Sequence, residues 1–233
     1  MVFFRSRIEC DMKAKRCLCQ AVVVLFVFLV PAKAERKALF DQLFGWGASE
    51  NRYASPPPAG KPSPVSGDYS FIDPNRMVPS RGLQPALAYY KAHRKSLRNP
   101  NYLTVVDFSQ HITARRMFVI DMRSGRVQPF IVAHGSGSDP GNTGHASVFM
   151  NKRETHASSL GFYRTGGIYL GQFGYSMRLT GLSASNSLAA ARTIVMHPWP
   201  AGSPTWGCLG VESGSAIYVI NALKGGSLIY AFR

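Results

Sequence analysis

Hydrophobic periodicity divides the chain into one helical stretch followed by strands. Leu83, Leu87, Tyr90 and Leu97 recur at helical spacing and Asn99-Pro100 ends the pattern, which predicts a helix over 83–97. Strand-length apolar runs predict strands over residues 102–108, 116–122, 127–133, 175–179, 193–197 and 227–232. A last helix has Ala216, Ile217, Ile220 and Leu223 on one face and ends at Gly225. The pattern predicts a mainly β domain with a few peripheral helices.

The first 34 residues are typical of a secretory signal peptide. Basic residues precede an apolar run of about 10 residues, Ala21 to Val30, which is half of the roughly 20 residues that span a bilayer. Pro31 ends the run and Ala32-Lys33-Ala34 matches a cleavage site. Cleavage there gives a secreted, periplasmic or cell-wall-associated protein without stable membrane insertion. An uncleaved membrane anchor is the alternative.

The segment after the signal peptide differs in composition from the rest. Residues 35–80 include the sequence SPPPAGKPSPVSG, which predicts a proline-rich and largely disordered linker. Residues 81–233 then form a single folded domain. The linker is either a tether that holds this domain away from a surface or a tail without a role.

Composition and charge narrow the classes of partner. The chain has 233 residues, 45% of them hydrophobic, which excludes a fully disordered protein. It carries 27 Lys and Arg against 12 Asp and Glu, a net charge of +15 that cleavage after Ala34 lowers to +11. A basic domain of this kind is attracted to anionic polymers. Secretion, and the lack of a basic stripe with interleaved aromatic residues, argue against nucleic acid as the partner.

The cysteine count changes on cleavage. Cys10, Cys17 and Cys19 leave with the signal peptide, so Cys208 alone remains among the 199 residues of the mature chain. An internal disulfide is then excluded. The remaining thiol is buried and inert, paired with another chain, or reactive.

The spacing of His197 and Cys208 favours a reactive thiol. His197 ends an apolar strand, and Cys208 follows eleven residues later across a proline-containing loop that can fold back. A neighbouring imidazolium lowers the pKa of a thiol, and the resulting thiolate is a nucleophile. Gly207 allows a substrate backbone to come close, and backbone N–H groups near Cys208 can stabilise an oxyanion. The alternative is a small buried cysteine beside a hydrogen-bonded core histidine.

Three blocks of the sequence resemble the murein L,D-transpeptidase catalytic domain, in its second YkuD-like subgroup. They are LTVVDFSQ to VAHGSGSD (103–139), SSLGFYRTGGIYLGQFGYSMRLTGL (158–182) and IVMHPWP to SPTWGCLGV (194–211). His197, Ser203, Gly207 and Cys208 match the family pattern of a strand histidine followed by Ser-x-x-Gly-Cys. Trp206 departs from the widespread branch, which has histidine there. The same branch has Arg or Asn soon after the cysteine, where this chain has Leu209-Gly210-Val211.

The resemblance implies a fold, a reaction and a partner. The implied fold is a mixed β-sandwich, and the implied reaction is acyl transfer on peptidoglycan stem peptides. Cys208 would attack the diaminopimelate carbonyl and release D-alanine while His197 manages protons. An amine acceptor would give a 3→3 cross-link, and water would give L,D-carboxypeptidase activity. Such enzymes need no metal or cofactor, and we expect a monomer.

Several further residues are candidates for substrate binding. His134 either orients His197, contacts substrate or is a structural histidine. Ser159 falls at a turn that lines the cleft in the family, and Trp206 would shape the cleft wall. Tyr163 either contacts a stem or packs in the sheet core. Arg178 either binds a substrate carboxylate or is solvated.

Two other functions compete with this interpretation. His134, His145 and His156 lie eleven residues apart near Asp139 and Glu154, as a zinc peptidase would require, although no short metal motif is present. A non-catalytic wall-binding protein would have the same charge and tether. A papain-like hydrolase is disfavoured because its cysteine precedes its histidine.

Overall fold

The computed structural model describes residues 68–233. The predicted signal peptide, and the predicted linker up to residue 67, lie outside the described residues. Residues 68–79, which the sequence assigned to the linker, pack against the domain instead. Ile72 and Val78 are buried, and the carboxylate of Asp73 accepts hydrogen bonds from the backbone N–H groups of Met77 and Val78, each over 2.8 Å. Within the described region, no helix is long and apolar enough to cross a membrane.

The described chain folds into a sheet with two α-helices and three short 3-10 turns. The helices are α3 (Ser80–His93) and α4 (Ser213–Leu223), and the 3-10 turns are η1 (Arg94–Ser96), η2 (Ser136–Ser138) and η3 (Ala184–Asn186). The strands are β1 (Tyr102–Asp107), β2 (Met117–Asp121), β3 (Val127–Phe130), β4 (Gly161–Gly171), β5 (Gly174–Gly181), β6 (Val195–Trp199), β7 (Leu209–Glu212) and β8 (Leu228–Phe232). The expected mainly β fold with peripheral helices is confirmed.

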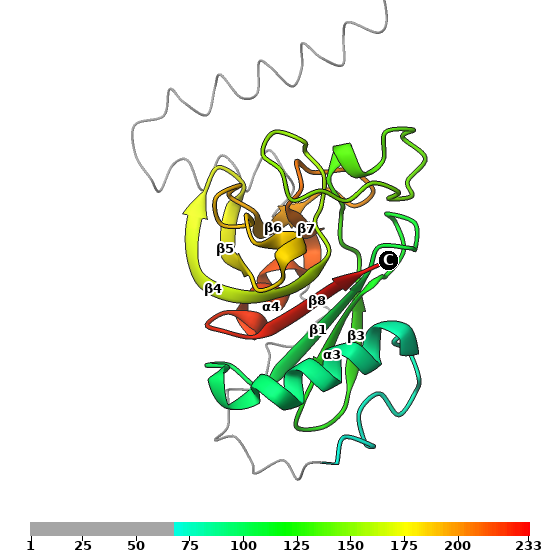
Figure 1. Ribbon diagram of the computed structural model, residues 1–233, viewed down its shortest axis with the longest axis vertical. Helices are drawn as coiled ribbons and strands as arrows, with labels where there is room; N and C mark the ends of the chain where they lie inside the picture. The colour runs from blue at the N-terminus through cyan, green and yellow to red at the C-terminus, as the bar shows by residue number, and fades with distance from the viewer. Residues whose placement is uncertain (1–67) are drawn as a thin grey trace, which may run out of the picture. The chain divides into compact units, whose positions relative to one another are not determined.

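The eight strands form one mixed sheet that curves until it nearly closes. Their order is β3-β2-β1-β8-β4-β5-β6-β7 (Figure 1). The pairs β1/β8 and β6/β7 are parallel, and the other neighbours are antiparallel. The chain after β3 reaches the opposite edge of the sheet, where Val132 bridges Val211 and Ala133 N–H donates to the Gly210 carbonyl over 2.8 Å. The sheet is therefore close to a barrel.

Two apolar clusters stabilise this arrangement. The larger one fills the inside of the curved sheet and includes Met196, Leu209 and the apolar face of α4. The second lies between α3 and strands β1, β2 and β8, and Tyr90 and Leu103 are buried in it. Figure 1 shows α3 lying along this part of the sheet. The burial of these side chains supplies most of the free energy that holds the strands in register.

The sequence did not predict strands β4 and β7, in which the alternation of hydrophobic and polar residues is weakest. β4 contains three glycines after its first residue and mostly exposed or half-buried positions, so its sequence lacks a strand alternation. β7 is only four residues long. β4 and β5 form the long hairpin beside β6, and β7 begins at the residue after Cys208.

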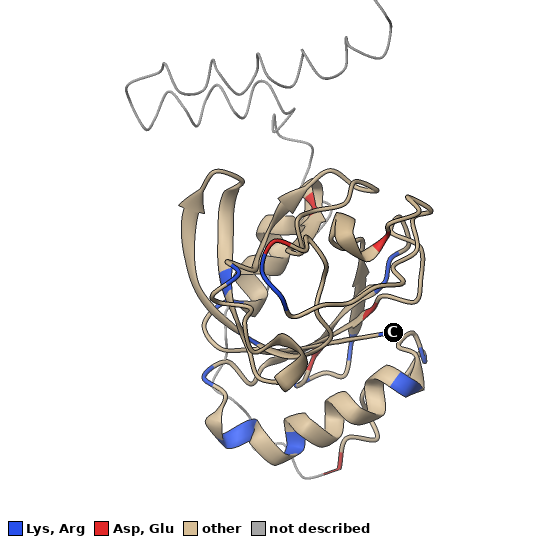
Figure 2. Cartoon of the chain, turned by 45° about the horizontal axis from the view of Figure 1, so that its top comes forward, with Lys and Arg blue, Asp and Glu red and all other residues tan. Residues whose placement is uncertain are grey.

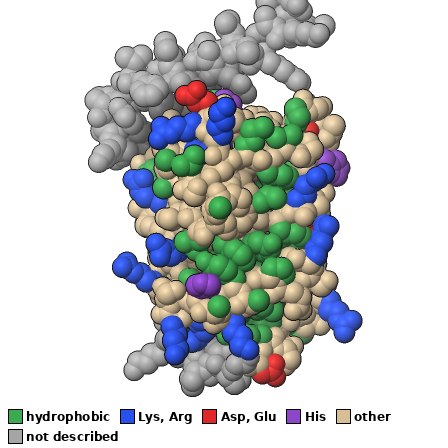
Figure 3. Space-filling model, in the orientation of Figure 1, with side chains coloured by type: hydrophobic (Ala, Val, Ile, Leu, Met, Phe, Trp, Pro, Cys, Tyr) green, Lys and Arg blue, Asp and Glu red, His purple; other side chains and the backbone are tan. Residues whose placement is uncertain are grey.

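Charge is spread over the surface of the described domain. Figure 2 shows Lys and Arg on α3 and on the loops, with few acidic residues. In the face drawn in Figure 3, basic side chains surround a central area of hydrophobic and uncharged atoms. On this face, the basic side chains are dispersed rather than gathered into one groove.

Candidate active site

His197 lies on β6, and Cys208 directly precedes the neighbouring parallel strand β7. Met196 pairs with Leu209 and His197 pairs with Gly210. Met196 and Leu209 point into the core, so the alternation of a strand directs His197 and the adjacent Cys208 to the opposite face. The sequence brings the two residues to neighbouring strands as expected.

The imidazole of His197 is held by its own strand and by two aromatic rings. Its Nδ1 lies 2.9 Å from the carbonyl oxygen of Pro198. A carbonyl only accepts, so Nδ1 carries the proton and Nε2 keeps a lone pair. The ring stacks on Phe173 at 4.4 Å and meets Trp199 edge-on at 5.2 Å. This burial lowers the pKa of His197, while the hydrogen bond to Pro198 opposes the shift. The imidazole is therefore neutral at pH 7.

The thiol of Cys208 is half-buried and protonated at rest. Its Sγ lies 3.8 Å from the Thr193 carbonyl oxygen, and the described residues give it no hydrogen bond to His197. Burial raises the pKa of Cys208, whereas a hydrogen bond from the Val195 backbone and the charge of Arg192 lower it by less. The expected imidazolium–thiolate pair is thus replaced by a neutral imidazole and a neutral thiol, because burial disfavours both charged forms.

The backbone before Cys208 requires glycine. Gly207 has φ +106°, and a Cβ built there would lie 2.8 Å from the Ala157 carbonyl oxygen. Its N–H donates to Thr205 Oγ1 over 3.1 Å, so this group is already used and is no free oxyanion donor. The Thr205 hydroxyl in turn donates to the Cys208 carbonyl oxygen over 2.8 Å. Gly207 therefore sets the conformation of the nucleophile loop.

Arg192 contacts the surroundings of Cys208, and the sequence did not single it out. Its Nη1 donates to the Met150 carbonyl oxygen over 2.8 Å and to Ser159 Oγ over 2.7 Å, and its Nη2 donates to the Ala157 carbonyl oxygen over 2.5 Å. The guanidinium also lies next to Gly207, since a Cβ there would be 3.1 Å from Nη2. It thereby ties the segment 150–159 to the loop of Cys208. Its position before a strand gives no pattern from which this role could be predicted.

The structure places two of the predicted substrate contacts in the protein interior. Ser159 is buried, donates from Oγ to the Met150 carbonyl oxygen over 2.7 Å and accepts from Arg192. Tyr163 is buried in the core, and its hydroxyl donates to the Ser159 carbonyl oxygen over 2.7 Å. Burial raises the pKa of Tyr163 to about 12. Neither side chain reaches solvent in this structure, and for Tyr163 this agrees with the core-packing alternative that the sequence left open.

Trp206 and Arg178 are accessible. The Trp206 side chain is 70% exposed and stacks on the ring of His156 with centroids 5.2 Å apart. Arg178 is exposed on β5, opposite Val195 of β6, and its guanidinium lies 4.6 Å from the centroid of the Tyr169 ring. Residues opposite each other share a face of the sheet, so Arg178 lies on the face that carries His197 and Cys208.

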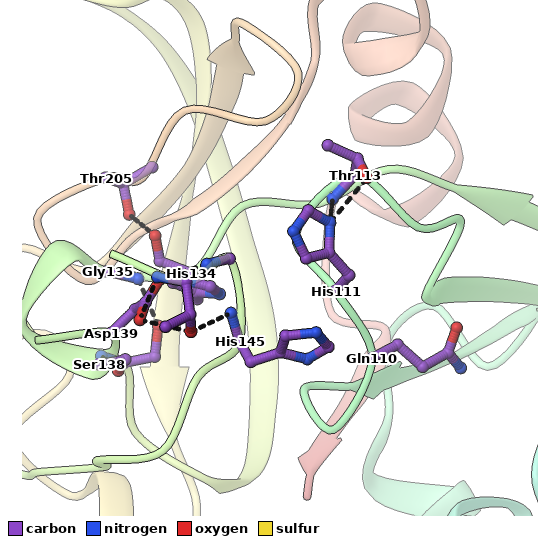
Figure 4. Close-up of polar contacts among 12 residues, drawn as sticks. Gln110, His111, Thr113, His134, Gly135, Ser138, Asp139, His145 and Thr205 are labelled. Atoms are coloured by element: carbon purple, nitrogen blue, oxygen red, sulfur yellow. Dashed lines mark hydrogen bonds and ion pairs between the residues drawn. The ribbon is translucent and has the colours of Figure 1, made fainter. Parts of the chain in front are cut away.

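His134 lies on the segment that borders this loop, but its ring faces other groups. Thr205 N–H donates to the His134 carbonyl oxygen over 2.8 Å. The ring contacts the buried guanidinium of Arg116 at 3.0 Å and lies 3.9 Å from Asp139 (Figure 4). Burial and the charge of Arg116 lower the pKa of His134 to about 4. The prediction that it orients His197 is not supported by these contacts.

The histidines considered for zinc are separated in the fold. His134 and His145 lie in the same region as Asp139, whereas His156 stacks on Trp206. Across residues 68–233, no group of three or more His, Cys, Asp or Glu side chains is placed to hold a metal ion.

Comparison with known families identifies the family of this domain. The family model for the L,D-transpeptidase catalytic domain matches residues 75–232. The chain belongs to this family. The suspected resemblance is thereby confirmed, and the match contains every element from α3 to β8.

Solved L,D-transpeptidase structures give weaker matches. The chain is 12% identical to L,D-transpeptidase 1 of Mycobacterium tuberculosis, covering 57% of this chain and 62% of that one, with a TM-score of 0.35. An L,D-transpeptidase from Mycobacterium smegmatis is 12% identical, with 57% and 59% covered and a TM-score of 0.36. One from Stackebrandtia nassauensis is 13% identical, with 57% and 56% covered and a TM-score of 0.35. The match thus spans about 60% of the length of these relatives. No curated protein sequence matches the chain significantly.

Proposed function

We propose that this domain is a cysteine-dependent acyl transferase that acts on the stem peptides of peptidoglycan. The observation that carries the proposal is the placement of His197 on β6 and of Cys208 directly before the neighbouring strand β7, with the proton of the imidazole held on Nδ1 by Pro198. The free lone pair on Nε2 is what a general base requires. Membership of the L,D-transpeptidase family supplies the reaction class.

Because the imidazole of His197 and the thiol of Cys208 are both neutral at rest, the first step includes a proton transfer between them. The thiol turns from the Thr193 carbonyl toward Nε2 of His197, which takes its proton as Sγ attacks the diaminopimelate carbonyl of a tetrapeptide stem. A bond forms between Sγ and the carbonyl carbon, and the carbonyl oxygen becomes an oxyanion. The backbone N–H of Cys208 is the candidate donor to it, since the N–H of Gly207 is bound to Thr205.

Collapse of this intermediate breaks the bond to D-alanine. The imidazolium of His197 returns its proton to the leaving amine, and the stem remains on Cys208 as a thioester. The amine of a second stem then attacks the thioester, loses a proton to Nε2 and releases the thiol, which completes a 3→3 cross-link. Water in place of the amine gives L,D-carboxypeptidase activity by the same steps.

The accessible residues around the thiol are assigned to substrate binding. Arg178 is the candidate partner for a stem carboxylate, because it lies exposed on the same face as Cys208. Trp206, next to Gly207, forms a wall of the cleft with His156. The proposal includes secretion to the periplasm or cell wall, attraction of a basic monomer to the anionic wall polymer, and no requirement for a metal.

Mass spectrometry of the purified chain tests this function. We expect incubation with a tetrapeptide stem to add the mass of the stem without its terminal D-alanine, and Cys208→Ala to abolish the adduct. The absence of an adduct on the wild type, or an equal adduct on Cys208→Ala, would refute the proposal that Cys208 is an acyl-transfer nucleophile. Persistent wall binding without an adduct would support the wall-binding alternative. Loss of activity in EDTA would instead favour the zinc peptidase, and product masses distinguish cross-linking from hydrolysis.

A further inference from the structure

A cavity beside His134 has no role in the acyl-transfer steps. Its volume is about 260 Å³, and its walls come from three segments: residues 111–113, 134–144 and 202–204. Neither His197 nor Cys208 lines it. Drug-sized ligands occupy pockets of roughly 300–1,000 Å³, so this cavity has room for a single ring or side chain. Figure 4 shows His134 and Asp139 on one side of this region and His111 on the other.

The contact with Arg116 fixes which nitrogen of His134 carries the proton. Nη2 of Arg116 lies 3.0 Å from Nδ1 of His134. A guanidinium only donates, so Nδ1 accepts and the proton of the neutral ring is on Nε2. Nε2 is buried and has no hydrogen-bond partner in the described structure. A buried donor without an acceptor is unfavourable, so this N–H requires an acceptor that the protein does not provide.

Asp139 lies beside this donor and is itself fixed. Its Oδ1 accepts from the N–H and the hydroxyl of Thr143, and its Oδ2 accepts from Gly144 N–H over 2.6 Å. These bonds hold the pKa of Asp139 below its ordinary value although burial raises it. Oδ2 is 3.9 Å from Nε2 of His134, which is too far for a hydrogen bond between them.

The two groups select the chemistry of an occupant. An oxygen atom that bridges the two groups must accept from Nε2–H and donate to Oδ2, as the hydroxyl of an alcohol or sugar does and as a water molecule does. Asp139 repels an anionic group, and a cation finds no acceptor in Nε2–H. Three of the other polar lining residues, Thr113, Asn142 and Thr143, carry no ionisable side chain and can bind neighbouring hydroxyls.

We propose that this cavity binds a sugar ring of the peptidoglycan strand through a hydroxyl shared between His134 and Asp139. This inference rests on the proposed function, since it takes peptidoglycan as the substrate. The loop that contains Cys208 also borders the cavity. Gly202 and Pro204 line the cavity, while Thr205 donates from its N–H to the His134 carbonyl and from its hydroxyl to the Cys208 carbonyl. A sugar in the cavity is therefore held by the loop that positions the nucleophile.

Nuclear magnetic resonance on the full mature chain tests the proposal with two probes. The first is the peptide-free disaccharide of peptidoglycan, and the second is the free tetrapeptide stem. We expect the disaccharide to shift the imidazole Nε2–H signal of His134, and the stem to leave it unchanged. The proposal is overturned if the stem alone shifts the His134 signal. It is also overturned if the disaccharide leaves the signal unchanged, which would mean that the cavity holds water only.

Substitutions at exposed positions test the cavity without disturbing the fold. Thr113 is exposed at the cavity rim, so Thr113→Trp fills the cavity from outside and should weaken disaccharide binding at least tenfold. Ser124→Trp, in the exposed turn between β2 and β3, is the matched control and should bind as the wild type does. Equal binding by both variants would contradict the proposal. Cys208→Ala should still bind the disaccharide, so failure of acylation and failure of sugar binding are distinguishable.

Discussion

Ser159 accepts a hydrogen bond from Nη1 of Arg192 over 2.7 Å, and this contact joins the segment 150–159 to the loop of the nucleophile. The same guanidinium reaches the Ala157 carbonyl and lies against Gly207. Among the described residues it is the cation whose charge lowers the pKa of Cys208. Arg192 therefore both packs against the loop and lowers the pKa of the thiol, whereas the sequence interpretation gave the lowering of this pKa to His197 alone.

Replacing Arg192 should make the thiol less reactive. In Arg192→Met the pKa of Cys208 should rise further, because burial then acts without the opposing charge. We expect alkylation by iodoacetamide at pH 7 to slow by roughly threefold to tenfold and the pH–rate profile to move to higher pH. Arg192→Lys keeps the charge and should recover part of the reactivity. A profile for Arg192→Met that coincides with the wild type would show that the residue acts only through packing.

Removing the base should stop acylation while the domain still folds. His197→Phe retains an aromatic ring against Phe173 and Trp199 but lacks Nε2. We expect the rate of thioester formation to fall by roughly 10²- to 10⁴-fold, as for the loss of a general base. Single-turnover mass spectrometry measures the rate, and circular dichroism checks the fold. A folded variant that keeps more than a tenth of the wild-type rate would exclude His197 as the base.

The sequence was most informative where hydrophobic pattern and chemistry coincide. The predicted strand 193–197 overlaps β6 (Val195–Trp199), and the predicted strand 102–108 contains β1 (Tyr102–Asp107), because buried strands need apolar residues whatever surrounds them. β4 and the anchoring role of Arg192 were missed for one physical reason. Both depend on contacts between residues far apart in the chain, such as Arg192 with Met150. Tyr163 was left between a stem contact and core packing, because pattern alone does not show which face of a strand is covered.

Gly207→Ala should damage both stability and activity. The residue has φ +106°, and the added Cβ would lie 2.8 Å from the Ala157 carbonyl oxygen. Strain of this kind costs about 1–3 kcal/mol. Urea unfolding should show this loss together with reduced acylation. Gly214→Ala is the matched control, since a Cβ there meets nothing within 4 Å, and it should be neutral or stabilising. Equal stability of the two variants would argue against the constraint at Gly207.

Tyr163→Phe separates structure from substrate binding. The change removes the hydroxyl that donates to the Ser159 carbonyl and leaves the ring in the core. We expect a loss of about 1 kcal/mol in the free energy of unfolding. The acylation rate and the KM for the stem should stay within about twofold of the wild type. A large rise in KM without loss of stability would restore Tyr163 as a substrate contact.

His134 should make the domain less stable as the pH falls. Burial, together with the charge of Arg116, lowers its pKa from 6.5 to about 4 in the folded state. Above pH 6.5 the ring is neutral in both states and the full stability is present. Between pH 6.5 and about 4 the unfolded chain binds a proton that the folded chain does not, so stability falls with pH. This contribution is about 2 kcal/mol between pH 7 and pH 5. Urea unfolding at both pH values measures it, and in His134→Asn the loss should be smaller by that amount. An equal pH dependence of both proteins would mean that His134 titrates near its ordinary pKa and that Arg116 does not hold it neutral.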